Sequence, residues 1–176
     1  MARADGGGGG IAMPNITYDA VRDLVYLEAD LLDRREWELW LDLYVDDCVY
    51  WVPSWASEDE LTEDPELEVN MIYLQGKPSL EARIYRIQSG LSYATSPLAR
   101  TSHLVDSIRL LNDKSETIEV SAKWMTLSSD PRWGKQIRGG WYEFQMCQTS
   151  SGLRIARKKI VLLESAIDGA IDIHQI

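Results

Sequence analysis

The hydrophobic pattern of this chain changes period part-way along its length, and the change limits the folds open to it. Up to about residue 91, most apolar residues recur at the spacing of buried helix faces. From Arg100 onward, apolar and polar residues alternate, as in strands with one buried face. Helices followed by a long antiparallel run of strands form an α+β pattern. A strongly curved sheet wrapped over the N-terminal helices would bury both kinds of apolar face.

We therefore predict a single α+β domain over residues 15–176. A run of five glycines, Gly6–Gly10, lies in the segment before it. Such a run costs much conformational entropy to order, so residues 1–14 are expected to form a flexible tail.

Three helices are predicted in the first half. Thr17 can cap the first, whose apolar stripe comprises Val21, Leu24, Val25, Leu31 and Leu32. Glu28 falls on that stripe, where a carboxylate is costly unless paired. We expect it to bond a backbone end or an arginine, with a role as a pocket acid as the alternative. A second short helix is expected near residues 36–43. Ser79 can cap a third, whose buried stripe is Leu80, Ile84, Ile87 and Leu91.

Strands dominate the remainder. Residues 48–53 favour a strand, and the acidic segment 57–68 is typical of a surface loop. Beyond Arg100, the residues predicted to face the core are Leu104, Ile108 and Leu110, then, after a turn at Asn112–Asp113, Ile118, Val120, Ala122 and Trp124. Residues 128–140 are predicted to form a long hairpin connection, because Asp130–Pro131 and Gly139–Gly140 break regular structure. Strands at 141–147 and 153–163 and a strand-like tail at 170–176 follow.

Charge and composition exclude several classes of function. The formal net charge is −10, which disfavours binding to nucleic acid or to an anionic membrane surface. No stretch approaches the roughly 20 apolar residues of a membrane helix, and residues 1–10 do not resemble a secretory signal. Two distant cysteines make no disulfide framework, so a cytoplasmic location is expected. Seven Trp and eight Tyr stand against one Phe. That excess suits either an interface or a core built from large aromatics.

Three stretches carry a family resemblance. They read WLDLYVDDCVYWVPSW at 40–55, NMIYLQGKPSLEARIYRI at 70–87 and RTSHLVD at 100–106. In this order and spacing they resemble the small, or β, subunit of aromatic-ring-hydroxylating dioxygenases. The segment DELTEDP at 59–65 and the ending IDIHQI at 171–176 are most similar to the benzoate, toluate and anthranilate branch. The resemblance covers nearly everything from Tyr18 onward.

The resemblance implies a fold, a partner and a role. The fold would be the cone-like, cystatin-like α+β fold of nuclear transport factor 2. The partner would be a large α subunit, usually in an α3β3 hexamer that contains a trimer of small subunits. The α subunit would carry a Rieske [2Fe–2S] cluster, a mononuclear Fe(II) and the aromatic substrate, with electrons from NADH through a reductase. The whole enzyme would add both atoms of O2 to the ring of an aromatic acid, and this chain would be structural.

The inventory of metal ligands agrees with that role independently. The chain has two histidines, His103 and His174, and two cysteines, Cys48 and Cys147. A Rieske cluster needs two Cys and two His in short-range pairs, and a mononuclear iron needs two His and a carboxylate. Four scattered residues cannot build both centres. A site from the two histidines and a carboxylate stays open but lacks helical spacing. The cysteines are expected to be small buried hydrophobes.

His103 is the strongest catalytic candidate among the alternatives. Enzymes of this fold use His and Asp inside the cone, and Asp47, His103 and Glu28 could supply such a group. Histidine has a pKa suited to general acid–base work. However, His103 is predicted to lie on the strand face opposite Leu104 and Ile108, away from the core. We therefore expect no catalytic residue in this chain, with Asp47 and His103 as the alternative pair.

The basic residues Arg154, Arg157, Lys158 and Lys159 stand out in an acidic chain. They form either a solvated sheet face or a surface that pairs with an acidic partner. Arg132, Trp133 and Arg138 could join an interface, since Arg and Trp commonly anchor such contacts.

Two functional hypotheses from different classes follow. The favoured one is a non-catalytic structural subunit of a multicomponent dioxygenase. The other is a free-standing dehydratase, isomerase or cyclase of the same fold that uses Asp47 and His103. A ligand-binding module without chemistry would share the pocket of the second but lack a titratable pair.

Overall fold

The computed structural model describes residues 16–90, 96–112, 117–167 and 169–176. The predicted tail at 1–14 therefore lies outside the described residues, as do Leu91 and Asp113. Within the described ranges, three α-helices and one 3-10 helix accompany six strands. The helices are α1 (Tyr18–Arg34), α2 (Trp37–Leu41), α3 (Lys77–Gln88) and η1 (Ile173–Gln175). The strands are β1 (Tyr44–Pro53), β2 (Asn70–Gln75), β3 (Arg100–Asn112), β4 (Thr117–Asp130), β5 (Gly134–Thr149) and β6 (Gly152–Leu162).

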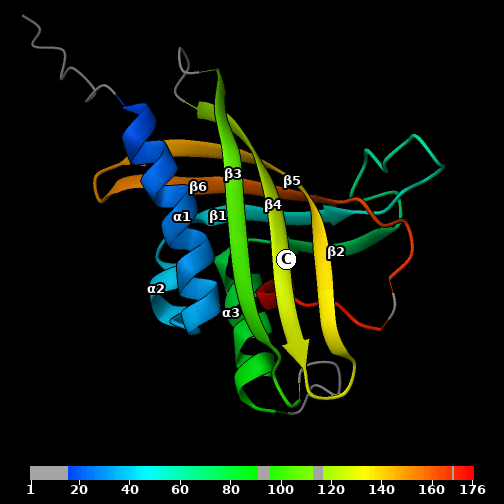
Figure 1. Ribbon diagram of the computed structural model, residues 1–176. Helices are drawn as coiled ribbons and strands as arrows, with labels where there is room; N and C mark the ends of the chain where they lie inside the picture. The colour runs from blue at the N-terminus through cyan, green and yellow to red at the C-terminus, as the bar shows by residue number, and fades with distance from the viewer. Residues whose placement is uncertain (1–15, 91–95, 113–116, 168) are drawn as a thin grey trace, which may run out of the picture.

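One mixed sheet contains all six strands, in the order β2-β1-β6-β5-β4-β3. Every pairing is antiparallel except that of β1 with β6, which is parallel. The sheet curves strongly, and the helices lie on its concave side (Figure 1). The predicted α+β class and the packing of N-terminal helices on a curved sheet are thus confirmed. Within the described ranges, none of the helices combines the length and apolar character needed to cross a membrane.

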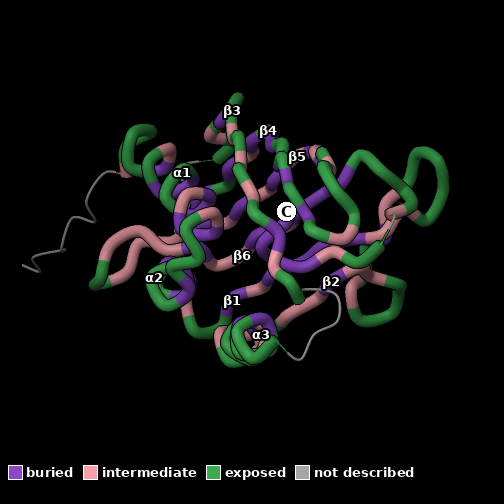
Figure 2. The backbone as a smooth tube through the Cα atoms, turned by 60° about the horizontal axis from the view of Figure 1, so that its bottom comes forward, coloured by how far each residue is buried: buried purple, intermediate pink, exposed green. Residues whose placement is uncertain are grey.

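Helix α1 forms where its caps and stripe predict it. The Thr17 hydroxyl accepts a hydrogen bond of 3.2 Å from the Ala20 amide, and Arg35 ends the helix in a left-handed conformation with φ of 60°. The five predicted stripe residues are all buried, and so is Glu28. They pack against a core that is rich in aromatic rings, with Trp40, Tyr50, Tyr142 and Phe144 fully buried. Figure 2 shows the buried stretches gathered where β1, β5 and β6 cross the middle of the molecule.

Helix α3 begins three residues earlier than predicted. It starts at Lys77 after Gly76, whose φ of 77° suits glycine, and Pro78 occupies the first turn. Ser79 is therefore inside the helix, and its hydroxyl donates to the Gln75 carbonyl at 2.6 Å instead of capping. Leu80, Ile84 and Ile87 are buried as predicted. Strand β2, which pairs with β1, was not expected from the pattern, and β1 begins at Tyr44 rather than at residue 48.

Strand β3 carries a β-bulge that reverses the predicted facing of its first half. Asp106 pairs with Lys123 and Arg109 pairs with Ser121, so Ser107 and Ile108 together oppose one residue of β4. Ser107 has φ of 54°. Because the bulge shifts the alternation by one, Ile108 is buried while Leu104 is 53% exposed. The prediction that Leu104 faces the core is wrong.

The predicted long connection at 128–140 is also wrong. Strand β4 runs to Asp130 and β5 starts at Gly134, so three residues join them. The Asp130 carboxylate accepts from the Arg132 and Trp133 amides at 2.7 and 3.2 Å and organises this turn. Gly139 and Gly140 lie within β5 rather than breaking it.

The end of the chain is not a strand. Residues 173–175 form the 3-10 helix η1, in which Asp172 and Gln175 build a capping box. Ile173, His174, Gln175 and Ile176 are all buried. The segment inserts between α3 and the sheet, where Figure 1 shows it in red. The Arg83 guanidinium of α3 holds Asp172 at 2.7 Å.

Candidate functional site

His103 lies in the interior and pairs with an aspartate that the sequence did not single out. Its Nδ1 is 2.6 Å from Asp33 Oδ1, and its backbone amide donates to Asp33 Oδ2 at 2.7 Å. Asp33 comes from the last turn of α1 and His103 from β3. The expectation that His103 faces away from the core is wrong, because the bulge at Ser107 places Ile108 and His103 on the same side. No apolar pattern marks Asp33, so sequence reasoning missed it.

The Asp33–His103 pair has the geometry of a general base but no access. Burial acts to raise the pKa of the Asp33 carboxyl, yet the hydrogen bonds from His103 outweigh it and hold that pKa below its usual value. The His103 side chain is 1% exposed. Its second nitrogen, Nε2, is buried and has no hydrogen-bond partner within the described part of the chain. General acid–base catalysis needs contact with the substrate, and this ring offers none as it stands.

Asp47 takes no part in this arrangement. It lies exposed in β1, a strand that is not adjacent to β3 in the sheet. The predicted Asp47, His103 and Glu28 group is therefore not brought together. Five surface hollows of the described residues have volumes between about 240 and 530 Å³, and neither His103 nor Glu28 lines any of them.

Glu28 is held instead by a buried lysine. Lys158 Nζ lies 2.8 Å from Glu28 Oε1 and 2.9 Å from Oε2, and both side chains are essentially inaccessible. Trp40 Nε1 and the Tyr44 hydroxyl also donate to Oε1, at 2.9 and 2.8 Å. The expected partner was an arginine or a backbone end, and Lys158 was placed in a surface cluster. Both expectations are wrong.

Aromatic rings complete the surroundings of the lysine. Its Nζ lies 4.2 Å from the centroid of the Tyr142 ring, within the range of a cation–π contact. Burial lowers the pKa of Lys158, and the Glu28 carboxylate opposes that effect. The pair joins α1 to β6 through hydrogen bonds on nearly every polar atom. This arrangement fixes the helix on the sheet and leaves neither charge available for chemistry.

His174 lies in the inserted C-terminal segment. It is 2% exposed, and neither ring nitrogen has a hydrogen-bond partner within the described residues. Burial lowers the pKa of this imidazole from 6.5 to about 4, against a weaker opposing effect of Asp172. The folded protein therefore holds His174 neutral.

We expect His174 to make the protein less stable in mild acid. Its pKa of about 4 in the folded state lies below the ordinary 6.5, so the unfolded chain binds more protons between these values. The stabilisation is complete above pH 6.5 and is lost as the pH falls toward 4. Between pH 7 and pH 5 the loss should be about 2 kcal/mol. Urea unfolding followed at each pH measures it.

The His174→Phe variant provides the control for this measurement. It keeps a ring of similar size and removes the titration, so its stability should change much less between pH 7 and pH 5. Asp33 and Asp130 have lowered pKa values and act below pH 4, outside this window. A variant that loses as much stability as the parent would show that another group is responsible.

The residues present do not fit either iron centre of the implied oxygenase. Cys48 is buried in β1 and Cys147 lies in β5, and β6 runs between these strands. Burial raises the pKa of the Cys48 thiol to about 11, so a thiolate ligand is disfavoured. Among the described residues, no three His, Cys, Asp or Glu side chains gather in a metal-binding group.

The remaining basic residues divide between the two faces of the sheet. Arg157 and Lys159 lie on the outer face, each 5.1 Å from the ring centroid of Trp51, beside a hollow of about 450 Å³. Lys159 also pairs with Glu143 at 3.3 Å. Arg138 is buried in β5, so it does not belong to an exposed surface, whereas Trp133 in the β4–β5 turn is 57% exposed.

Comparison with known proteins gives a consistent result over the length of the chain. The family model described as "Ring hydroxylating beta subunit" matches residues 27–169. The chain is 33% identical over 162 residues to toluate 1,2-dioxygenase subunit beta of Pseudomonas putida, and this alignment covers 92% of the chain and 99% of that protein. It is 30% identical over 169 residues to benzoate 1,2-dioxygenase subunit beta of Acinetobacter baylyi, with 93% and 96% covered.

Solved structures support the same fold. The β subunit of benzoate 1,2-dioxygenase from Burkholderia mallei superposes with a TM-score of 0.76 at 29% identity, over 93% of this chain and all (100%) of that one. An NTF2-like protein with a cystatin-like fold from Novosphingobium aromaticivorans gives a TM-score of 0.58 at 16% identity, with 84% and 82% covered. That second likeness concerns the fold alone. The predicted family resemblance and fold class are both confirmed.

Proposed function

This chain belongs to the ring-hydroxylating β-subunit family, and we propose that it serves as the non-catalytic structural subunit of an aromatic-ring dioxygenase. The observation that carries the proposal is the match along the chain to small subunits of such enzymes. The closed Asp33–His103 pair and the fully bonded Glu28–Lys158 pair support it, because neither presents a reactive group to a substrate. The chain therefore contributes no catalytic residue.

The chemistry then belongs to a large α subunit. That subunit holds a Rieske [2Fe–2S] cluster and a mononuclear Fe(II), and a reductase passes it electrons from NADH. The iron centres supply oxygen activation, and both atoms of O2 enter the aromatic ring. The relatives are named for toluate, benzoate and anthranilate, which supports an aromatic acid as the substrate. We place the assembly in the cytoplasm as an α3β3 hexamer.

The first test is co-purification. Expressed together with the large subunit of its own dioxygenase, this chain should elute from a sizing column in one stable complex. Expressed alone, it should contain no stoichiometric iron or acid-labile sulfide and show no visible absorption, because its ligands fit neither centre. A correctly folded large subunit that elutes without this chain would contradict the proposal.

A reconstituted variant separates a structural His103 from a catalytic one. In His103→Asn, the side-chain amide can still donate to Asp33, so the fold should persist. The kcat of the complex should stay within about twofold of the parent, whereas loss of a general base costs about 10²-fold or more. A loss of that size in a correctly assembled complex would identify His103 as catalytic.

A further inference from the structure

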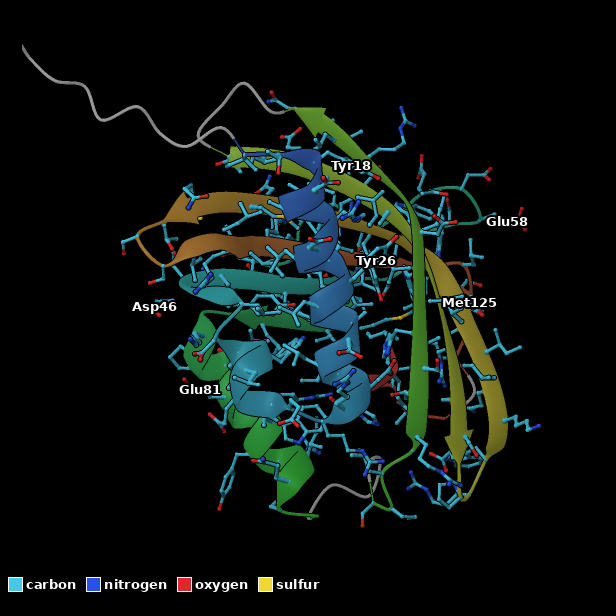
Figure 3. All side chains as sticks on the ribbon, turned by 60° about the vertical axis from the view of Figure 1, so that its left-hand side comes forward. Tyr18, Tyr26, Asp46, Glu58, Glu81 and Met125 are labelled. Atoms are coloured by element: carbon cyan, nitrogen blue, oxygen red, sulfur yellow. The ribbon has the colours of Figure 1, made fainter. Side chains whose placement is uncertain are left out.

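We propose that the outer face of β3, β4 and β5 is the surface that binds the large subunit. Five exposed side chains form its centre, here called the apolar patch: Leu104, Met125, Leu127, Ile137 and Leu163. This inference rests on the proposed function and adds to it the place of contact and the chemistry of the partner. Figure 3 shows Met125 on the side of the sheet away from α1.

The strand register makes the apolar patch continuous. Leu104 of β3 lies directly opposite Met125 of β4, and Leu127 lies directly opposite Ile137 of β5. Met125 and Leu127 are two residues apart and so share a face. Gly139 of β5 lies directly opposite Met125 and places no side chain between Met125 and the next strand. The Leu163 amide donates to the Gly139 carbonyl at 2.9 Å, so Leu163 follows Gly139 in the same row of residues across the sheet. Leu104, Met125, Leu127 and Ile137 are therefore neighbours on adjacent strands, and Leu163 lies in the same row as Met125, on the far side of Gly139.

Their exposure is unusual for a structural sheet face. The exposed fractions are 53% for Leu104, 45% for Met125 and for Leu127, 63% for Ile137 and 67% for Leu163. Single exposed apolar residues are ordinary, but a contiguous group marks a surface that another molecule covers. The bulge at Ser107 contributes, because it turns Leu104 outward while Ile108 stays in the core.

The charges around the patch identify the kind of partner. Two rows of residues that run across the strands flank the apolar patch. One contains the exposed Arg100 and Lys135 on either side of Ser129, and the other contains the exposed Asp106 opposite the exposed Lys123. These two rows therefore contain three cations and one anion, although the whole chain has a formal net charge of −10. Two copies meeting face to face about a twofold axis parallel to the strands would place each row opposite itself and bring the cations of the first row together. A large subunit with an apolar centre and carboxylates around it fits instead.

The experiment measures binding of the purified large subunit to immobilised small-subunit variants. Leu127→Glu and Ile137→Glu each place a carboxylate in the patch and should raise Kd at least about tenfold. Lys135→Glu should weaken binding and reduce its dependence on salt. The matched control is Leu39→Glu on α2, where an equally exposed leucine (55%) lies away from this sheet face. Circular dichroism and thermal unfolding check the fold, and Leu163→Glu, beyond the end of β6, replaces any strand variant that does not fold.

Each outcome of the binding experiment either supports the proposal or overturns it. Weaker binding in the patch variants but not in Leu39→Glu supports the proposal. Parent-like binding in all of them overturns it and leaves the proposed function standing. A changed oligomeric state of the isolated variants with parent-like affinity for the large subunit would assign the patch to a second copy and also overturn it. If the parent chain itself does not bind the large subunit, the proposed function fails and this inference fails with it.

Discussion

Replacing Lys158 with methionine is expected to lower the free energy of unfolding by about 3–5 kcal/mol. The substitution keeps most of the aliphatic volume but leaves Glu28 buried, with Trp40 and Tyr44 as its donors among the described residues. A carboxylate in that position must either stay charged without a cation or take up a proton, and both are costly. Urea denaturation at pH 7 measures the change.

Two further variants show whether the cost comes from an unpaired charge. Lys159→Met changes the neighbouring lysine, whose partner Glu143 is 45% exposed, and should cost at most about 1 kcal/mol. Adding Glu28→Leu to Lys158→Met removes both charges and should recover much of the stability. A double variant less stable than either single one would show that lost packing, rather than lost pairing, dominates.

The helical part of the fold could be predicted because its information is local. Thr17 caps α1, and the stripe from Val21 to Leu32 is buried. Spacing alone determines which face of a helix is apolar. Likewise, the alternation from Ile118 to Trp124 correctly indicated one buried face of β4. Predicting these elements required no information about the residues against which they pack.

The errors arise where tertiary contacts decide. One inserted residue at Ser107 reverses the facing of His103 and Leu104, and nothing in the sequence around it requires a bulge. Lys158 stands in a run of basic residues, which suggests an exposed position. Its burial depends on the pairing with Glu28, which lies 130 positions away and cannot be read from the local sequence. The 170–176 segment alternates like a strand but joins neither edge strand of the sheet, β2 or β3. It folds into η1 against α3 through the Arg83–Asp172 pair.

For the candidate site, the sequence supports an expectation that does not depend on the fold. The count of histidines and cysteines predicts that the iron centres lie in another chain, and this stays a prediction. The partner of His103 could not be found in this way. Asp33 lies on α1, 70 positions from His103, and only the packing of α1 against β3 brings the two together.

The glycine pair of β5 leads to a second large effect. Gly139–Gly140 was interpreted as a break, yet both residues pair within the sheet. A Cβ at Gly140 would lie 1.9 Å from the Val161 carbonyl oxygen and 2.9 Å from its carbon. Backbone atoms of a central strand cannot move aside as a flexible side chain can. Gly140→Ala should therefore cost about 3 kcal/mol or more, by forcing β5 and β6 apart.

Gly139→Ala is the matched control, since it changes the adjacent glycine of the same strand in the same way. Its Cβ would meet the Trp124 carbonyl oxygen at 3.1 Å, a contact that a shift of a few tenths of an ångström relieves. Its cost in thermal and urea unfolding should be clearly smaller than that of Gly140→Ala. Equal stability of the two variants would mean that Val161 and the rest of β6 can move away from a Cβ at residue 140. The close approach of β5 and β6 at Gly140 would then not be required for stability.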